Sequence, residues 1–293
     1  KADYAKVVDQ CYLCDLCYLT KCPYVPPHEW NLDFPHTMLR AKAIKFKKGD
    51  VTGGEKFLAS TDTHGQFAGI PIVVQAVNAV NKTKFARGVM ENMLGVDKDA
   101  WLPELATRKF RSGAAESPAF PVKDGAKTPG KVAIYSTCYI NYNEPGIGHD
   151  LLKVLAHNEV PYVLVEKEKC CGMPKLELGD LDSVNASKEA NIPVLAKYAK
   201  DGFAILSAVP SCTLMFKQEL PLMYPDDADV QAVKEAMWDP FEYLMQRKRD
   251  GLLKTEFPQP LGKISYQIPC HGRVQNIGKK PEEMLKMVPQ TWV

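Results

Sequence analysis

The sequence lacks three features that would place it in common functional classes. No run of about 18 apolar residues occurs, so no segment is long enough to cross a membrane by itself. Neither sign of charge dominates, because 37 Lys and Arg residues face 35 Asp and Glu residues, and this balance argues against a nucleic-acid partner. A glycine-rich nucleotide loop is also missing, since Gly146-x-Gly148 is too short for a dinucleotide fingerprint.

Cysteine, by contrast, is abundant. The chain has nine cysteines, an odd number that cannot pair completely into disulfides. They fall in tight local clusters, which is typical of metal binding in a reducing compartment rather than of a secreted disulfide scaffold. We therefore expect a cytoplasmic protein whose cysteines bind metal.

The chain divides by composition into successive regions. Residues 49–129 are predicted to be mostly helical, with breaks at 53–54, 69–71 and Pro103, and residues 112–130 form a linker rich in Ser, Gly, Ala and Pro. A basic helix over 36–48 follows Pro35, which suits a first helical turn. The predicted domains are a cysteine-rich module (1–48), the helical region and linker (49–129), an α/β unit (130–261) and the start of a second unit (262–293).

Strands and helices alternate after Gly130. Apolar, β-rich runs cover 131–137, 161–165 and 203–209, and helices are predicted over 149–158 and 181–200. This alternation predicts an α/β fold with a parallel sheet. A cysteine follows each predicted strand, at the end of an open α/β sheet where ligands collect.

An internal repeat indicates that this unit occurs twice. Gly130-Lys131-Val132-Ala133 leads to Cys138, and Gly262-Lys263-Ile264-Ser265 leads to Cys270, 132 positions later. The second unit breaks off at Val293. We expect its counterpart of Cys170–Cys171 about ten residues beyond that position, where it would complete a second site with Cys270 as first ligand.

The first cysteine motif is compact. It reads Cys11-x2-Cys14-x2-Cys17-x4-Cys22-Pro23. Two-residue gaps let a tight loop place thiolates on several irons of a [4Fe–4S] cluster, whereas zinc sites usually take separated cysteine pairs. Either Cys22 completes the same cluster, or it serves a second cluster whose motif lies upstream of Lys1, and we favour the second arrangement.

The second cysteine motif is dispersed. It reads Cys138-x31-Cys170-Cys171-Gly172-x39-Cys212. Adjacent side chains of an extended strand point to opposite faces, so Cys170 and Cys171 can serve one site only if the backbone turns there. Gly172 permits such a turn. Buried apolar cysteines are the alternative explanation, but their shared position after strands favours a cluster site.

The repeated Cys…Cys-Cys-Gly…Cys pattern resembles the cysteine-rich CCG domain. That domain occurs in the B subunit of heterodisulfide reductase, in the C subunit of anaerobic glycerol-3-phosphate dehydrogenase, and in the iron–sulfur subunits of glycolate oxidase and lactate utilisation systems. The resemblance covers residues 1–48 and 130–293. It implies an N-terminal helical ferredoxin-like module followed by repeated Rossmann-like CCG domains.

The resemblance also implies a function. Such a chain is an iron–sulfur subunit that passes electrons between a flavoprotein dehydrogenase and a quinone or another carrier, with flavin bound only by a partner. At least one [4Fe–4S] cluster is expected in the N-terminal module and one in the first CCG domain. The implied ligands are Cys11, Cys14, Cys17, Cys22, Cys138, Cys170, Cys171, Cys212 and Cys270.

One position departs from the family pattern. A second cysteine often follows three residues after the last one, but this chain has Met215 there. Four ligands suit an ordinary four-ligand cluster better than the five-cysteine noncubane cluster of heterodisulfide reductase. Catalytic thiol–disulfide reduction is therefore the second hypothesis, and a zinc-bound scaffold or redox sensor is the third.

Several basic and histidine residues have two interpretations. The helix over 38–48 carries five Lys and Arg residues, and it is interpreted as a solvated helix or, alternatively, as a peripheral contact to a membrane or an acidic partner. His271 follows Cys270 and is interpreted as structural, with ligand or proton donor as alternatives. His28 and His36 flank the first motif, and structural roles are favoured for them too.

Overall fold

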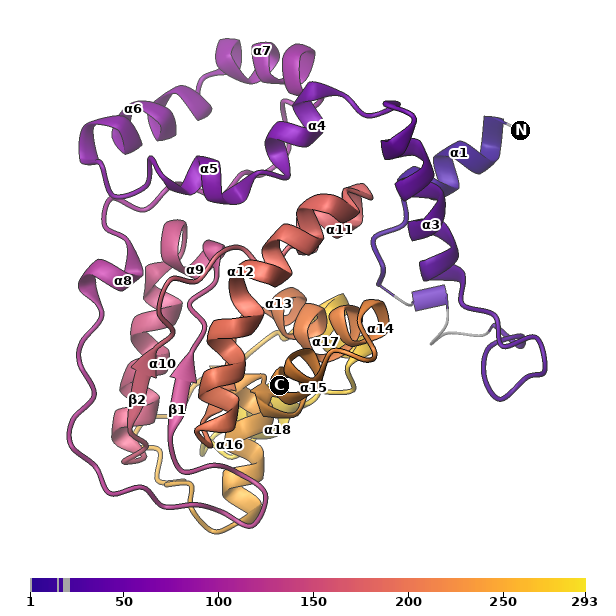
Figure 1. Cartoon of the computed structure of the whole chain (residues 1–293). Coiled ribbons are helices and arrows are strands. Elements are labelled where there is room, and N and C mark those ends of the chain that lie inside the picture. Colours follow the sequence, from indigo (N-terminus) through magenta and orange to yellow (C-terminus); the bar gives the residue numbers. More distant parts are fainter. Residues whose placement is uncertain (1, 15, 18–21) are drawn as a thin grey trace.

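The computed structural model describes residues 2–14, 16–17 and 22–293. An α/β body lies at the centre, with N-terminal helices on one side and an arm of helices above it (Figure 1). The predicted mixed α/β class is confirmed. Within the described residues, no helix has both the length and the apolar character needed to cross a membrane.

The body is built on a small parallel sheet. Its strands, in the spatial order β2-β1-β3-β4, are β2 (Tyr162–Leu164), β1 (Val132–Ile134), β3 (Ala204–Leu206) and β4 (Met237–Trp238). All neighbours are parallel, and Val132 pairs with Tyr162 on one side and with Ala204 on the other. Three of these strands match the predicted runs, although each is only three residues long.

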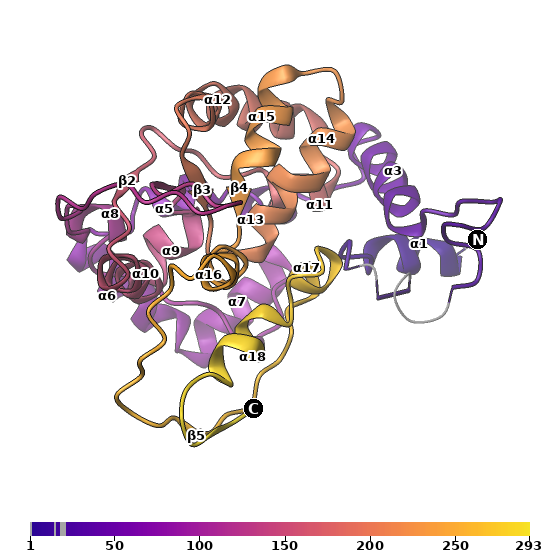
Figure 2. The ribbon, with the colours of Figure 1, turned by 90° about the horizontal axis from the view of Figure 1, so that it is seen from below.

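Alternating side chains of the central strands feed two apolar layers. Ala133 and Ile205 point into a layer with helices α12 (Leu181–Lys200) and α15 (Ala228–Ala236). Val132, Ile134 and their neighbours on β3 point into a second layer with α10 (Pro145–His157) and α16 (Pro240–Arg249). Figure 2 shows the sheet between these helix pairs. Both faces are therefore covered, which explains why the strands are apolar at every position.

Short helices follow the strands and complete the body. They are α9 (Cys138–Tyr142), α11 (Met173–Leu178), α13 (Pro210–Leu214), the π-helix η1 (Met215–Glu219) and α14 (Leu220–Met223). Helix α12 spans the predicted residues 181–200 without change.

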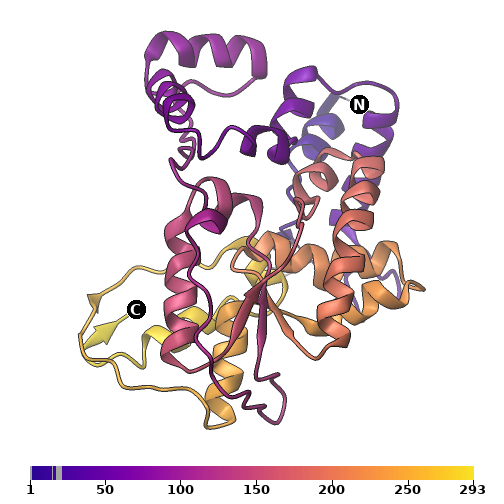
Figure 3. The ribbon, with the colours of Figure 1, turned by 60° about the vertical axis from the view of Figure 1, so that its left-hand side comes forward.

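The N-terminal part and the arm are helical. The N-terminal part contains the described helices α1 (Ala2–Asp9) and α3 (Phe34–Lys47). The arm contains α4 (Gly53–Leu58), α5 (Thr61–Gly65), α6 (Pro71–Asn81) and α7 (Lys84–Leu94), and α8 (Phe110–Gly113) follows it. Figure 3 shows α6 and α7 set apart from the sheet. Helix α3 agrees with the predicted basic helix and has Pro35 in its first turn, and residues 114–131 connect α8 to β1 without helix or strand, as expected of a linker.

The glycine pair Gly53–Gly54, predicted as a break, instead opens α4. Thr52 caps this helix, since its side chain accepts the Glu55 N–H and Glu55 in turn accepts the Thr52 N–H. A Cβ at Gly54 would lie 2.9 Å from the Leu94 Cα. Glycine here serves the close approach of α4 to α7 rather than the end of a helix.

The last residues repeat an order of elements seen earlier. They form β5 (Gly262–Lys263), α17 (Cys270–Val274), α18 (Lys280–Leu285) and β6 (Thr291–Trp292), and the two strands pair in parallel. The same order, β1-α9-α10-β2, begins the body. In both segments a cysteine is the first residue of the helix after the first strand.

Candidate metal centre

Four cysteines meet where three parallel strands of the body end. Cys138 follows β1, Cys170 and Cys171 follow β2, and Cys212 follows β3. Cys170, Cys171 and Cys212 have exposed fractions of 1%, 3% and 4%. The sheet thus gathers residues that lie up to 74 positions apart in the sequence.

The backbone turns sharply at two of these strand ends. Thr137 has a φ of 65° and caps α9 by accepting the Ile140 N–H. Gly172 has a φ of 98°, in the region that favours glycine, and begins α11. The predicted turn at Gly172 is therefore present, and it allows both Cys170 and Cys171 to face the same interior.

The four thiols form a connected chain of contacts. Cys138 hydrogen-bonds to Cys170, and Cys171 hydrogen-bonds to both Cys170 and Cys212. The bonds from Cys138 and Cys171 lower the pKa of Cys170, because they stabilise its thiolate. The same bonds, together with burial, raise the pKa of Cys138 and Cys171. These shifts stabilise the thiolate of Cys170 and keep Cys138 and Cys171 protonated.

The arm supplies two residues to this group that the sequence analysis did not single out. The Cys170 N–H donates to both carboxylate oxygens of Asp62, at 3.2 and 3.1 Å. The Thr61 hydroxyl lies against the Cys138 and Cys170 thiols, and it is buried without a well-aligned partner. Burial raises the pKa of Asp62. No motif marks Asp62, which lies 108 positions before Cys170.

Polar side chains fix the loop that carries Cys170. Asn191 on α12 accepts the Lys169 N–H at 2.9 Å and donates to the Cys170 carbonyl at 3.2 Å. Glu168 accepts the Ser136 N–H at 2.8 Å and pairs with Arg111 at 3.2 Å. These bonds tie the ends of β1 and β2 together, so the cysteines after them have little freedom to separate.

The N-terminal cysteines are placed differently. Cys17 and Cys22 line a cavity of about 140 Å³ together with Val25, Leu32, Phe34 and Pro35. Cys11 instead packs against the core that contains Cys170 and Cys171, and its carbonyl accepts a hydrogen bond from Lys42. Cys14 is half-buried. Residues 15 and 18–21 of this motif lie outside the described residues.

Within residues 2–14, 16–17 and 22–293, no three His, Cys, Asp or Glu side chains form a group arranged to hold a metal ion. At the strand ends the thiols follow one another as a chain rather than surround a point. Which cysteines bind metal therefore stays a prediction.

The histidines near the motifs all have protein partners. His28 accepts the Trp30 N–H at 3.1 Å and packs edge-on against Tyr24. His36 lies 2.7 Å from Asp33 and 3.0 Å from the buried Glu219. His271 lies 2.8 Å from the Ser211 hydroxyl and 3.2 Å from the Tyr12 carbonyl.

Cys270 is exposed, at the start of α17. Helix α17 packs against α13, which carries Cys212. In Figure 2, α17 points toward the N-terminal helices.

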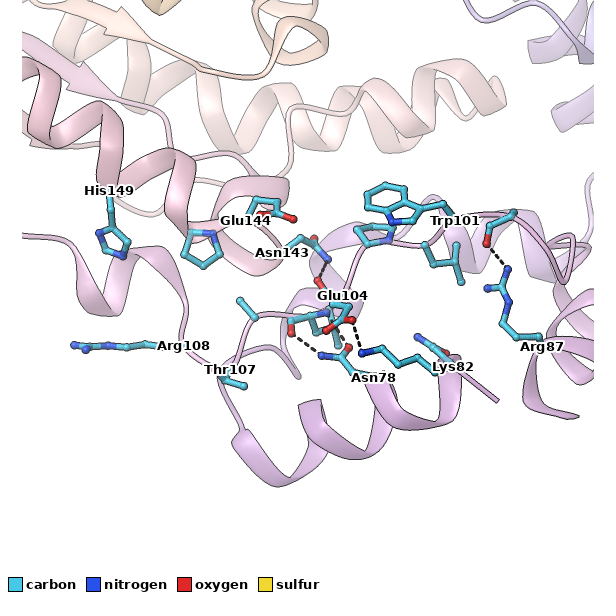
Figure 4. Close-up of a pocket in the computed structure, with 17 residues that line it drawn as sticks. Asn78, Lys82, Arg87, Trp101, Glu104, Thr107, Arg108, Asn143, Glu144 and His149 are labelled. Carbon is cyan, nitrogen blue, oxygen red and sulfur yellow. Dashed lines mark hydrogen bonds and ion pairs between the residues drawn. The ribbon is translucent and has the colours of Figure 1, made fainter. Parts of the chain in front are cut away.

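A pocket of about 890 Å³ lies between the arm and α10, and no cysteine lines it. Its polar groups largely pair with one another, as Figure 4 shows for Lys82 with Glu104 at 2.6 Å. Asn78 likewise bonds both the N–H and the carbonyl of Leu105. The pocket therefore lies where the arm meets the α/β body and is not part of the cysteine site.

Comparison with known proteins agrees with the cysteine pattern. Residues 132–217 match the family model of the CCG cysteine-rich domain. The C subunit of the anaerobic glycerol-3-phosphate dehydrogenase of Escherichia coli K12 is 27% identical over 218 residues, which cover 73% of this chain and 52% of that protein. An iron–sulfur protein of Methanocaldococcus jannaschii is 27% identical over 231 residues, covering 75% of this chain and 42% of that protein.

A third relative is less similar to this chain. The B subunit of the fumarate reductase (CoM/CoB) of Methanothermobacter marburgensis is 25% identical over 171 residues, covering 57% of this chain and 32% of that protein. The chain thus spans about half the length, or less, of these relatives. No solved structure matches it significantly. The match of residues 132–217 to the CCG model and the similarity to these subunits confirm the resemblance to iron–sulfur oxidoreductase subunits inferred from the sequence.

Proposed function

We propose that this chain is an iron–sulfur electron-transfer subunit of an oxidoreductase complex. The observation that carries the proposal is the convergence of Cys138, Cys170, Cys171 and Cys212 into one connected group of thiols, three of which are buried. Thiolates are the usual ligands of iron–sulfur clusters. Two of the similar proteins are named as subunits of a dehydrogenase and of a reductase, which supports the same role.

The donor set fits a cluster with several irons. All four converging groups are thiols, and the Thr61 hydroxyl beside them is buried without a well-aligned partner. A bound cluster would displace the protons of Cys138 and Cys171, because its irons stabilise the thiolate form of their side chains. When bound, such a cluster supplies one-electron redox chemistry.

We assign one [4Fe–4S] cluster to the strand-end cysteines and one to Cys11, Cys14 and Cys17 of a ferredoxin-like module, with Cys22 as a ligand of a further cluster. Cys270 is proposed as the first ligand of a second CCG site. The matching order of β5-α17-α18-β6 and β1-α9-α10-β2 supports this repeat.

The partners we propose are a flavoprotein dehydrogenase as electron donor and a quinone or another carrier as acceptor. Flavin belongs to the partner. The basic helix α3 is partly used inside the chain, since Lys42 bonds the Cys11 carbonyl and Lys45 pairs with Asp9 at 2.8 Å. Peripheral contact with a membrane is therefore assigned to partner subunits, and the chain itself to the cytoplasm.

Electron transfer is favoured over disulfide exchange by the burial of the thiols. A disulfide substrate must reach an attacking thiolate, but Cys170, whose pKa is lowered by its bonds to neighbouring thiols, is 1% exposed. Met215, where a fifth cysteine would stand, is fully buried.

Metal analysis after anaerobic reconstitution tests the proposal. We expect iron and sulfide together with visible absorption that dithionite bleaches, and we expect Cys171→Ser to lower iron by about one cluster per chain. His157→Leu, at an exposed position of α10, is the control and should keep the wild-type iron content. Zinc without sulfide, or unchanged iron in Cys171→Ser, would refute the assignment.

A further inference from the structure

One side chain links the two cysteine regions. The His271 ring lies between the Tyr12 carbonyl, 3.2 Å from Nε2, and the Ser211 hydroxyl, 2.8 Å from Nδ1. Tyr12 stands between Cys11 and Cys14, and Ser211 directly precedes Cys212. His271 thus reaches both motifs through atoms next to their cysteines.

The hydrogen-bond partners of His271 indicate which ring nitrogen carries the proton. A carbonyl oxygen only accepts hydrogen bonds, so Nε2 carries a proton and donates it to Tyr12. In the neutral ring, Nδ1 then accepts the Ser211 O–H. Both ring nitrogens are occupied, which leaves neither available as a metal ligand in this arrangement.

His271 is itself held in place. The Gln275 side-chain amide donates to the Pro210 carbonyl at 3.0 Å and to the His271 carbonyl at 2.6 Å. This amide fastens α17 to the start of α13. Glu177 of α11 lies 4.0 Å from Nε2, so a third element after a strand faces the same ring.

The N-terminal loop is docked at the point where His271 contacts it. Leu13 is buried in the apolar core that also contains Cys170, Cys171 and Cys212, and Cys11 packs against that core. On the other side of the loop, Lys42 donates to the Cys11 carbonyl and lies 5.7 Å from the centre of the Tyr12 ring. The loop therefore lies between α3 and the CCG domain.

We propose that His271 is a positioning residue that clamps the N-terminal cysteine loop onto the Cys212 end of the CCG domain. It touches no cysteine sulfur and acts through the Tyr12 and Ser211 groups. Redox sites depend on surrounding hydrogen bonds that fix their relative geometry. The redox consequence, a fixed spacing of the two centres, rests on the proposed function; the clamp itself does not.

Hydrogen exchange of the metal-free full chain tests the clamp directly. We expect His271→Leu to speed amide exchange in peptides covering residues 8–14 at least tenfold, and Ser211→Ala to have a smaller effect in the same peptides. His271→Gln, whose amide N–H can replace the Nε2 donor, should restore part of the protection. His157→Leu, an exposed histidine at the end of α10, is the matched control and should leave these peptides unchanged.

A second readout follows from the reconstituted protein. His271→Leu should keep the wild-type iron content but weaken the magnetic interaction between the two reduced centres in electron paramagnetic resonance spectra. Should His271→Leu fail to fold, Ser211→Ala and His271→Gln carry the exchange test. Wild-type protection of residues 8–14 in His271→Leu, or in Ser211→Ala if His271→Leu does not fold, would overturn the clamp, whereas a chain that binds no iron would overturn the proposed function alone.

Discussion

The two cysteine groups differ in where their members lie close together: the N-terminal group in the sequence, and the CCG group in the fold. The N-terminal motif occupies twelve consecutive positions, yet Cys11 packs on the CCG core while Cys17 and Cys22 line a separate small cavity. The CCG motif is dispersed in sequence, yet its four thiols form one connected chain of contacts.

The difference lies in what holds each group. Strand ends of one parallel sheet fix the CCG cysteines, and bonds from Asn191 and Asp62 secure the Cys170 backbone. The N-terminal loop is held by the burial of Leu13 in the same core and by contacts from distant side chains, such as Lys42 and His271. Close spacing in the sequence therefore does not by itself bring thiols to one place, whereas a sheet can prearrange distant ligands.

Substitution of Gly172 is expected to have the largest effect on the difference between the two cysteine groups. Gly172→Ala would place a Cβ at a φ of 98° and 3.3 Å from the Ser187 Cβ, so we expect a loss of about 1–3 kcal/mol in the free energy of unfolding. Iron should be lost from the CCG site but kept at the N-terminal motif. Urea unfolding and iron analysis measure both effects.

The control for this change is Gly146→Ala, in the first turn of α10. No atom lies within 4 Å of a Cβ at that position, so stability should be unchanged or rise by up to about 1 kcal/mol. Equal effects of the two substitutions would show that the turn at Gly172 does not order the site.

Asp62 tests whether the arm contributes to the order of the CCG site. Asp62→Ala leaves the Cys170 N–H without its acceptor, which costs about 1–2 kcal/mol for a buried group. Asp62→Asn keeps an acceptor oxygen and should cost less. The free energy of unfolding and the rate of iron loss to a chelator measure the difference, and an Ala variant as stable as the Asn variant would contradict the role given to this contact.

The smallest effect is expected where α3 meets the CCG domain. The hydrogen bond to Glu219 raises the pKa of His36 from 6.5 to about 9, and both Glu219 and Asp33 add attraction. Because the folded-state pKa is the higher one, this contribution to stability is complete below pH 6.5 and is lost as the pH rises through about 9. After allowance for partial exposure, it amounts to about 1 kcal/mol.

Chemical unfolding of the wild type and His36→Gln between pH 6 and 10 checks this link. The stability difference between the two proteins should shrink as the pH rises. A constant difference across that range would mean that the charge of His36 does not stabilise the docking of α3.

The sequence was sufficient to predict elements whose signal is local. Apolar runs predicted the first three strands of the sheet, and the positions after them predicted where Cys138, Cys170 and Cys212 would meet. The positive φ of Gly172 could be predicted because two adjacent cysteines need a turn to face one site.

Other features depend on tertiary contacts and left no local signal. Strand β4 is two residues long, and its register with β3 shows only in the folded sheet. Asp62 lies in a five-residue helix of the arm and accepts a hydrogen bond from the N–H of Cys170, which lies in a different region of the chain. The pairing of Glu219 with His36 spans 183 positions. Such contacts are set by how regions pack, and spacing along the chain cannot show them.

The contact between His271 and Tyr12 can form only late in the synthesis of the chain. Tyr12 and His271 are separated by 259 positions. At about 5–20 residues per second, synthesis of the intervening chain takes roughly 13 to 52 seconds. Throughout that interval the first cysteine loop exists without its carboxyl-terminal partner, so its thiols can be loaded, or oxidised, before the contact that later holds them can form.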